Sequence, residues 1–322
     1  MITINVGPSE AGSRLDRLLR KRLPLMGLSE IYGLIRRGAV KVNGKKAKQN
    51  HRLTLSEQLQ IDVNESEFQA EPKADFSLAN LTGTEFFKKN FKILFEDSSL
   101  IACNKPAGLV VHSGTGHQSR DNLIDLATAY ILSKQQKSSD QQIPVLMHRL
   151  DRDTSGVILL AKNKSVVRVL HEEMRNGKFT KQYTAVCHHR PPKYEGTVTL
   201  GLKRTDRSST GMKMSVEEDG SQSSTSYRIL EYNNELSRLE IFLHTGKTHQ
   251  IRVHMAHLEA PIVGDERYGS KDLDDSLFSS RSLPRRLYLH AQKLTFPHPI
   301  TAKMTTIEAP VPKEFSKVFQ TQ

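Results

Sequence analysis

Periodic apolar residues divide the chain into a short N-terminal segment of helices and strands and a longer segment in which strands prevail. Leucines at a helical spacing predict one helix that begins at Ser13 and a second that begins near Ser29. The Asn43-Gly44 pair between two alternating runs predicts a tight hairpin, and a further alternating strand follows. We therefore expect a small α/β domain over residues 12–63.

Residues 64–90 interrupt these patterns, because they are acidic and contain Pro, Gly and Asn, and we expect them to form a linker with at most one short helical turn. Over residues 91–318, predicted strands outnumber helices, and most are joined by short turns. A polar stretch at 204–214 is expected to leave the sheet between two of these strands. This pattern predicts an α+β domain with a large mixed, mainly antiparallel sheet and flanking helices. No apolar run is long enough for a membrane span, and the N-terminus lacks a signal-peptide pattern, so we expect a cytoplasmic protein.

Positive charge is concentrated in the N-terminal domain, which indicates a function for that domain. The chain has a net charge of +12, and residues 12–60 hold 12 Lys and Arg against three acidic residues. A run of charge is most often a solvated face, but an excess without acids to pair with it indicates a surface that binds phosphates. The residues expected on this surface are Arg14, Arg17, Lys21, Arg36, Arg37, Lys45 and Lys46.

Residues 147–156 place a cluster of charged residues between two apolar runs, which predicts a strand, a loop and a second strand. An ordinary turn is one interpretation, since Asp, Ser and Gly are common turn residues. Four charged residues beside two core strands favour the other interpretation, a functional loop, because buried charge is kept where it is paired or used.

The sequence HRLDRDTSG at 148–156 resembles the signature of the RluA family of RNA pseudouridine synthases. Three further blocks match that family in order, NKPAG at 104–108, KQY at 181–183 and TGKTHQIRVH at 245–254. The resemblance extends from about residue 91 to the C-terminus. The basic N-terminal domain, with its VNGKK turn, is similar to the RNA-binding domain named after ribosomal protein S4.

The resemblance implies which residues carry the chemistry. It assigns the central role to Asp151, as nucleophile or as base, and an ion pair with this carboxylate to Arg252. Tyr183 matches the aromatic residue that stacks on the uracil, and Arg149 matches the residue that fills the space of the extruded base. Lys247 departs from the usual Arg of the family, which keeps the charge but loses the bidentate fork, so we leave it out of the site.

The resemblance also implies the substrate and partners. The chain is similar to the branch of the family that isomerises uridine to pseudouridine in large-subunit ribosomal RNA. This reaction needs no metal and no cofactor, since the base is only detached, rotated and rejoined. We expect a monomer that binds ribosomal RNA and no membrane.

One competing interpretation is a magnesium-dependent phosphatase of the haloacid-dehalogenase type. Residues 151–154 resemble its Asp-x-Asp-x-Thr motif, and Asp274 and Asp275 would be the metal ligands. Against this interpretation, His148 and Arg149 stand where that family has apolar residues, and no doubly wound pattern surrounds the motif.

Two further interpretations are a zinc site and a non-catalytic RNA-binding protein. The zinc ligands would be His249, His254 and His257, but their spacing fits no common motif and no Cys joins them. A binding protein would explain the basic domain but not the presence of Asp151, Tyr183 and Arg252 together.

The two cysteines, Cys103 and Cys187, lie in apolar stretches, so we expect buried free thiols.

Overall fold

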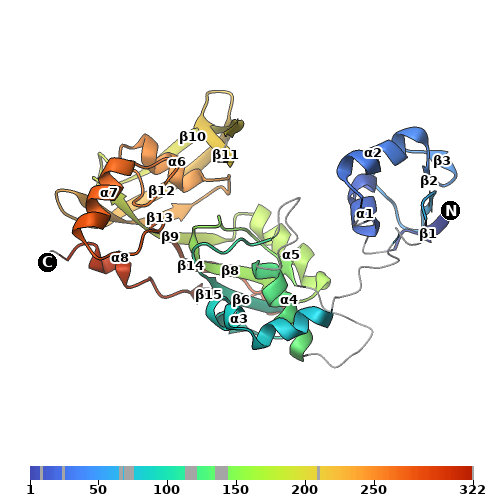
Figure 1. The fold of residues 1–322 in the computed structure, drawn as a ribbon, viewed down its shortest axis with the longest axis horizontal. Coiled ribbons are helices and arrows are strands. Elements are labelled where there is room, and N and C mark those ends of the chain that lie inside the picture. The colour runs from blue at the N-terminus through green and yellow to red at the C-terminus, as the bar shows by residue number, and fades with distance from the viewer. Residues whose placement is uncertain are drawn as a thin grey trace. The chain divides into compact units, whose positions relative to one another are not determined.

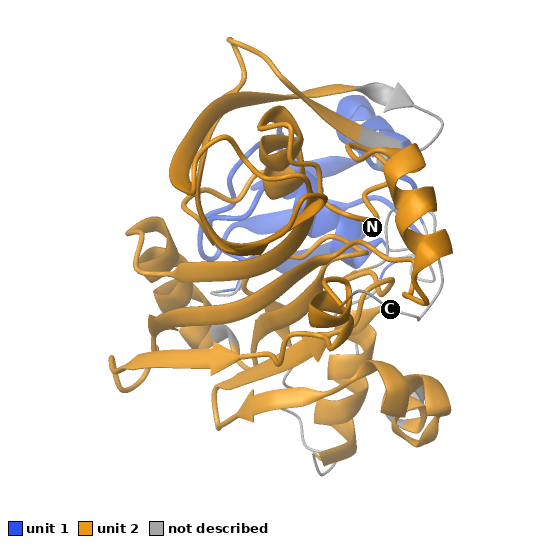
Figure 2. Ribbon diagram, turned by 90° about the vertical axis from the view of Figure 1, so that its left-hand side faces the viewer, with its two compact units in different colours: residues 1–75 blue, residues 76–322 orange. Residues whose placement is uncertain are grey.

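The computed structural model describes residues 1–7, 10–23, 26–64, 68, 76–112, 122–134, 144–208 and 211–320. The chain forms two compact units, Met1–Asp75 and Phe76–Gln322, which Figure 2 shows in different colours. Most of the acidic part of the expected linker lies outside the described residues. Across the described ranges, every helix is too short or too polar to cross a membrane.

The first unit, unit 1, packs two helices against a four-stranded sheet. Its elements are β1 (Ile2–Asn5), α1 (Leu15–Arg22), α2 (Leu28–Arg37), β2 (Val40–Val42), β3 (Lys45–Lys46) and β4 (Gln58–Ile61). The strand order is β1-β4-β2-β3, and the paired strands are antiparallel. The apolar faces of α1 and α2 bury a core against these strands, so the unit has a hydrophobic core of its own.

Local geometry in unit 1 confirms the predicted hairpin and corrects one helix cap. Asn43 and Gly44 both have positive φ, 48° and 76°, as the tight turn between β2 and β3 requires. The residue that caps α1 is Arg14 and not Ser13, whose hydroxyl donates instead to the carbonyl of Glu10. The serine hydroxyl therefore closes the preceding turn.

The second unit, unit 2, is built on one large sheet (Figure 1). Its elements are η2 (Phe76–Gly83), α3 (Glu85–Asn90), β5 (Ile93–Glu96), β6 (Leu100–Lys105), α4 (Leu123–Lys134), β7 (Val145–Leu146), β8 (Ser155–Ala161), α5 (Lys164–Arg175), β9 (Thr180–His188), β10 (Glu195–Ser208), β11 (Gly211–Val216), β12 (Ser221–Tyr232), β13 (Leu236–Leu243), α6 (Gln250–His257), α7 (Lys271–Ser280), β14 (Leu289–Pro297), β15 (Met304–Glu308) and α8 (Glu314–Lys317).

The order in this sheet is β11-β10-β12-β13-β9-β14-β8-β6-β5, with β15 paired to β14 and β7 paired to β8. Among the described residues, β8 and β14 are parallel, and the other paired strands are antiparallel. The large, mixed and mainly antiparallel sheet and the α+β class are as predicted.

Two segments of unit 2 differ from the sequence prediction. Residues 76–90, expected in the linker, form η2 and α3, and Phe86 and Phe87 pack against the core of unit 2. Thr84 begins α3 by accepting a hydrogen bond from the backbone N–H of Phe87 at 3.1 Å. The described part of residues 204–214, expected to leave the sheet as a polar excursion, instead belongs to the sheet, because β10 continues to Ser208 and β11 begins at Gly211.

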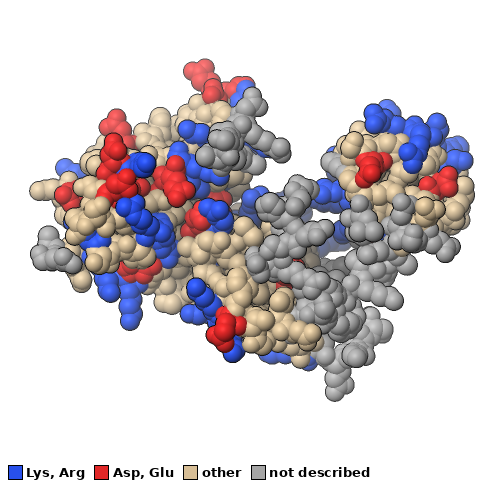
Figure 3. All heavy atoms as spheres, in the orientation of Figure 1, with Lys and Arg blue, Asp and Glu red and all other residues tan. Residues whose placement is uncertain are grey.

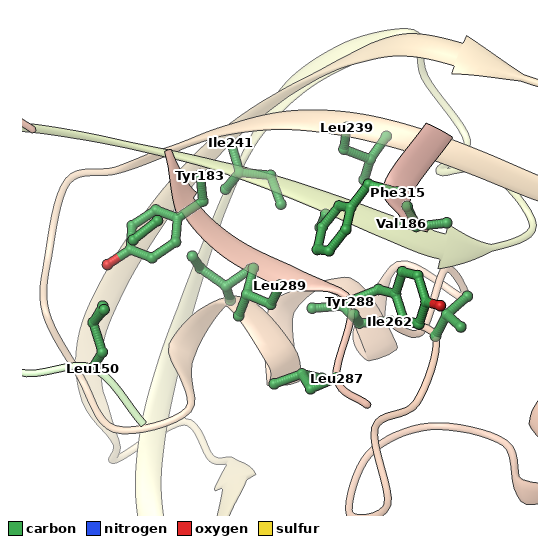
Figure 4. Close-up of a cluster of buried hydrophobic side chains, with 14 of the residues drawn as sticks. Leu150, Tyr183, Val186, Leu239, Ile241, Ile262, Leu287, Tyr288, Leu289 and Phe315 are labelled. Atoms are coloured by element: carbon green, nitrogen blue, oxygen red, sulfur yellow. The ribbon is translucent and has the colours of Figure 1, made fainter. Parts of the chain in front are cut away.

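The main core of unit 2 anchors the loop that carries the central motif. Leu150 in this loop is buried and belongs to the same core cluster as side chains from β9, β13 and β14. Figure 4 shows Tyr183 and Leu289 in this cluster, with the Tyr183 hydroxyl pointing away from Ile241 and Leu289. Apolar packing at Leu150 therefore anchors the loop directly before Asp151.

The end of the same loop is fixed where β8 meets β14. Gly156 has φ of 117°, and a Cβ there would lie 2.2 Å from the carbonyl oxygen of Ala291, so no larger residue fits. The Ser155 hydroxyl lies 2.8 Å from Nδ1 of His290 and accepts a hydrogen bond from Arg286 at 2.6 Å. Close packing and buried hydrogen bonds thus set the point at which the loop ends.

Both cysteines are free and fully buried, as predicted. Cys103 lies on β6 and Cys187 on β9. Burial raises the pKa of both thiols, so they remain protonated and unreactive in the folded protein.

Candidate active site

The loop between β7 and β8 opens into a cavity of about 660 Å³ in unit 2. Its walls come from the loop, β9, the end of β13 and the start of α6. The four side chains predicted to carry the chemistry all line this cavity, namely Arg149, Asp151, Tyr183 and Arg252. The sheet therefore brings together residues that are up to 103 positions apart in the sequence.

The Asp151 carboxylate is partly exposed to the cavity and is approached by two nitrogen donors on one side. Its Oδ2 lies 3.6 Å from Nη1 of Arg252 and 3.8 Å from Nε2 of His249. The side chain of Asp151 is 21% exposed, whereas that of Arg252 is only 7% exposed. The carboxylate is thus presented to the cavity, while the positive charge beside it is shielded from solvent.

Asp265 orients Arg252. The guanidinium forms a bidentate pair with Asp265, with both N–O distances 2.7 Å. The Asp265 side chain is fully buried and also accepts the backbone N–H groups of Arg267 and Tyr268 at 3.0 and 3.1 Å. Burial opposes the charge on Arg252, but Asp265 outweighs it and raises the pKa of the guanidinium. The sequence predicted the pair with Asp151 and missed this closer partner.

Tyr183 presents a protonated hydroxyl to the cavity. It lies on β9, opposite Ile241 on β13 and Ala291 on β14, and it is 6% exposed. Burial and, to a lesser extent, the charge of Asp151 raise the pKa of the phenol. The hydroxyl therefore keeps its proton at neutral pH and acts as a hydrogen-bond donor.

His148 and Arg149 are neighbours that both line the cavity but differ in their contacts. Arg149 is exposed at the cavity, where its guanidinium is accessible to a ligand. His148 accepts the backbone N–H of Leu159 at 3.1 Å, and burial lowers its pKa to about 3, so the ring is neutral. The histidine therefore fastens the loop to β8, and the arginine remains accessible from the cavity.

Lys105 supports the loop from inside the unit. Its ammonium group is fully buried and donates hydrogen bonds to the carbonyl oxygens of Pro106, Leu109 and Arg152 at 2.8, 2.7 and 2.8 Å. Burial lowers the pKa of this lysine to about 7. The contact to Arg152 fixes the backbone next to Asp151. This lysine lies in the matching block NKPAG, and the resemblance assigned it no role.

The residues of the phosphatase interpretation have structural partners. Asp274 lies 2.7 Å from Nε2 of His188 and accepts the backbone N–H of Gly264 at 2.9 Å. Asp275 pairs with Arg285 at 2.7 Å. These contacts account for both carboxylates without a metal.

Two of the three histidines of the zinc interpretation have separate partners. His254 is buried, with Nε2 2.9 Å from the hydroxyl of Ser223, whereas His249 contacts Tyr268. Among the described residues, no group of three His, Cys, Asp or Glu side chains is arranged to hold a metal ion.

On unit 1, the predicted phosphate-binding residues are mostly exposed. Figure 3 shows Lys and Arg gathered on the face of unit 1 that carries α2 and the β2–β3 hairpin. Six of the seven are exposed without an acidic partner among the contacts described, namely Arg17, Lys21, Arg36, Arg37, Lys45 and Lys46. Arg14 is an exception, because Asp16 accepts two hydrogen bonds from it at 3.1 and 2.7 Å. The expectation that this unit lacks acids to pair with its cations was wrong at this position.

Some of these basic residues line two hollows on the surface of unit 1. Arg14 and Arg17 line a hollow of about 360 Å³, and Lys45 and Lys46 line another of about 590 Å³. Lys46 also lies over Gly38, where an added Cβ would come within 2.3 Å of its Cε. The structure thus distributes the predicted basic surface over more than one part of the unit.

Residues 99–257 match the RNA pseudouridylate synthase family, and residues 13–59 match the S4 domain family. These matches cover the cavity with Asp151, Tyr183 and Arg252, and the basic unit, respectively. The chain belongs to the RNA pseudouridylate synthase family and is an isomerase that acts on uridine in RNA.

Curated relatives match over almost the whole chain. It is 32% identical, over 98% of its length and 95% of the relative, to ribosomal large subunit pseudouridine synthase C of Salmonella typhi, and equally similar to that of Escherichia coli (strain K12). It is 33% identical to the protein of the same name from Buchnera aphidicola subsp. Baizongia pistaciae, over 98% of this chain and 96% of that protein.

Solved structures show the same fold. Human RNA pseudouridylate synthase domain containing 4 superposes with a TM-score of 0.58 at 24% identity, covering 76% of this chain and 95% of that one. Human RNA pseudouridylate synthase domain containing 1 superposes with a TM-score of 0.54 at 22% identity, covering 69% of this chain and 83% of that one.

Proposed function

We propose that this enzyme converts specific uridines of large-subunit ribosomal RNA into pseudouridine and that Asp151 is its catalytic carboxylate. The observation that carries the proposal is the Asp151 carboxylate, exposed in a cavity and 3.6 Å from the buried guanidinium of Arg252. The cavity volume lies within the usual range of about 300 to 1,000 Å³ for ligand sites. The named relatives, similar over almost the whole chain, support the choice of RNA.

The reaction breaks the bond between N1 of uracil and C1′ of ribose, rotates the base and joins C5 to C1′. The proton on C5 is lost and N1 gains one, so the atoms balance without another reactant. Asp151 attacks C1′ or removes the 2′ proton, and the guanidinium of Arg252 lies beside its carboxylate. Tyr183 stacks on the uracil and exchanges a proton with it through its hydroxyl.

A uridine in folded RNA reaches Asp151 only after it is extruded from its stack. Arg149 is exposed at the cavity, and its planar guanidinium fills the place that the base leaves. Unit 1 holds the RNA through phosphate contacts, which provide affinity without reading sequence. In this proposal the enzyme is a cytoplasmic monomer that uses neither a metal nor a cofactor.

Pseudouridine mapping in ribosomal RNA tests the proposal. A strain that lacks the gene is complemented with the unchanged gene, with Asp151→Asn or with Asp153→Asn. Asp153 is a matched control, because this neighbouring carboxylate pairs with Arg152 at 2.9 Å. The unchanged gene and Asp153→Asn should restore modification of large-subunit RNA, whereas Asp151→Asn should bind RNA without restoring it. Full restoration by Asp151→Asn would refute the catalytic assignment, and sites outside large-subunit RNA would refute the substrate.

A further inference from the structure

His249 lies between the carboxylate of Asp151 and the phenol of Tyr268. Its Nδ1 is 2.9 Å from the Tyr268 oxygen, and its Nε2 is 3.8 Å from Oδ2 of Asp151. The residue caps α6 with φ of 54°, a left-handed conformation that is costly for a residue with a Cβ. Strain of this kind persists where the surroundings hold a side chain in place, and it is frequent at functional sites.

Hydrogen bonds around Tyr268 indicate which nitrogen of His249 carries the proton. The backbone N–H of Met214 on β11 donates to the Tyr268 oxygen at 2.9 Å. The phenol hydrogen is then available for Nδ1 of His249, which places the imidazole hydrogen on Nε2. The opposite tautomer would turn the Nε2 lone pair towards the carboxylate of Asp151 and give the Tyr268 oxygen two donors. Both consequences are unfavourable, so the Nε2–H form is preferred.

The ionisation states agree with this arrangement. Burial lowers the pKa of His249, and Arg252 adds to this effect, against the opposing charge of Asp151. The ring is therefore neutral near pH 7, with one hydrogen and one lone pair. Burial raises the pKa of Tyr268, so its hydroxyl keeps the hydrogen that it donates.

We propose that His249 is a positioning residue for Asp151, and that Tyr268 and the backbone of β11 set its tautomer. Nε2–H of His249 and Nη1 of Arg252 both approach Oδ2 of Asp151, which leaves Oδ1 to react with the ribose. Such contacts are often long in a site without substrate and shorten when the substrate binds. The inference rests on the catalytic role proposed for Asp151.

Two substitutions of His249 separate this role from a structural one. In His249→Gln the amide nitrogen can occupy the place of Nε2, whereas in His249→Asn the shorter side chain reaches only the place of Nδ1. We expect His249→Gln to retain kcat within a few-fold and His249→Asn to lose on the order of 10- to 100-fold, with KM for RNA unchanged. Equal losses in the two variants, or a loss confined to KM, would overturn the proposal.

A double-mutant cycle tests the part of Tyr268. Tyr268→Phe keeps the ring, which lies 5.2 Å from the Arg252 guanidinium, but removes the hydroxyl. It should lower kcat in the unchanged enzyme and have little effect in His249→Gln, because a glutamine donor has no tautomer to set. Additive effects would exclude coupling between these residues.

Nitrogen NMR of the full-length enzyme supplies a measurement independent of turnover. The His249 signal is assigned by its loss in His249→Gln, and long-range proton–nitrogen correlations distinguish the two tautomers. We expect the Nε2–H form in the unchanged enzyme and a mixture in Tyr268→Phe. An Nδ1–H form in the unchanged enzyme would overturn the inference whatever the activity of Asp151→Asn, whereas an active Asp151→Asn would refute the proposed function whatever the tautomer.

Discussion

Arg252 makes its bidentate contact with Asp265 and a longer approach, 3.6 Å, to Asp151. The guanidinium is thus oriented by a fully buried partner before any RNA binds. Because the guanidinium is already oriented, it needs little reorganisation during the reaction, and this is the main advantage of a preorganised charge.

Asp265→Asn should therefore impair both stability and catalysis. Removing one partner of a buried pair leaves an uncompensated charge, and we expect a loss of about 3 kcal/mol in the free energy of unfolding. The single-turnover rate should fall as well, since the Arg252 guanidinium is no longer held by its bidentate contact with Asp265. Urea unfolding and single-turnover assays measure the two effects. Asp275→Asn, which removes an exposed partner of Arg285, is the control and should change neither.

Lys105→Met should loosen the loop that carries Asp151. The substitution keeps much of the side-chain volume but leaves three buried carbonyl groups without their donor. We expect a loss of about 2 to 4 kcal/mol in the free energy of unfolding and a reduced kcat. Lys89→Met, at an exposed position of α3, should leave both unchanged. An unaltered kcat in a destabilised Lys105→Met would show that the contact to Arg152 does not position Asp151.

Glu96 makes the stability of unit 2 depend on pH. Burial would raise the pKa of this carboxyl, but hydrogen bonds from Lys162, Tyr130 and Lys134 outweigh it and lower the pKa from 4.5 to about 2. Stabilisation is then fully present above pH 4.5 and is lost as the pH falls towards 2. Glu96→Gln should lower the free energy of unfolding by about 2 kcal/mol at pH 7 and by less at pH 3. Equal losses in urea unfolding at both pH values would contradict this assignment.

Replacing two exposed arginines of unit 1 should weaken RNA binding without changing the chemistry. We expect Arg36→Gln with Arg37→Gln to reduce the slope of log affinity against log salt by about 0.7 to 0.9 for each lost phosphate contact. The single-turnover rate at saturating RNA should be unchanged. Arg14→Gln should have a smaller effect, because Asp16 already occupies its guanidinium. Titrations at several potassium chloride concentrations measure the slopes, and equal slopes in all variants would exclude a phosphate-binding role for this face.

Periodicity predicted the parts of the fold in which one face of an element is buried. The leucine spacing of α1 and the Asn43-Gly44 turn were sufficient for most of unit 1. The part of β10 beyond Lys203 and the strand β11 were missed, because exposed residues such as Lys203 and Arg204 leave no alternation of buried and exposed positions that would mark a strand. The segment 76–90 was missed because its composition resembles a linker, although Phe86 and Phe87 contact the core.

The candidate site was predictable to the extent that it lies in blocks of matching sequence. Asp151, Tyr183 and Arg252 were found in this way, and the sheet brings them to one cavity. Asp265 was missed because a pair between residues 13 positions apart depends on how α6 and the following turn pack, which no local pattern encodes. His249 was considered only as a metal ligand, because its partner Tyr268 lies in a different segment.

Because of where the two cysteines lie, their reaction with a thiol reagent reports local opening of unit 2. Cys103 and Cys187 are the only cysteines of the chain, and both are fully buried in the sheet of unit 2. A thiol reagent can modify them only when β6 or β9 separates from its neighbours, and a burial-raised pKa suppresses reaction in the closed state. The labelling rate in native buffer therefore measures how often the catalytic unit opens, while unfolding of unit 1 contributes no signal.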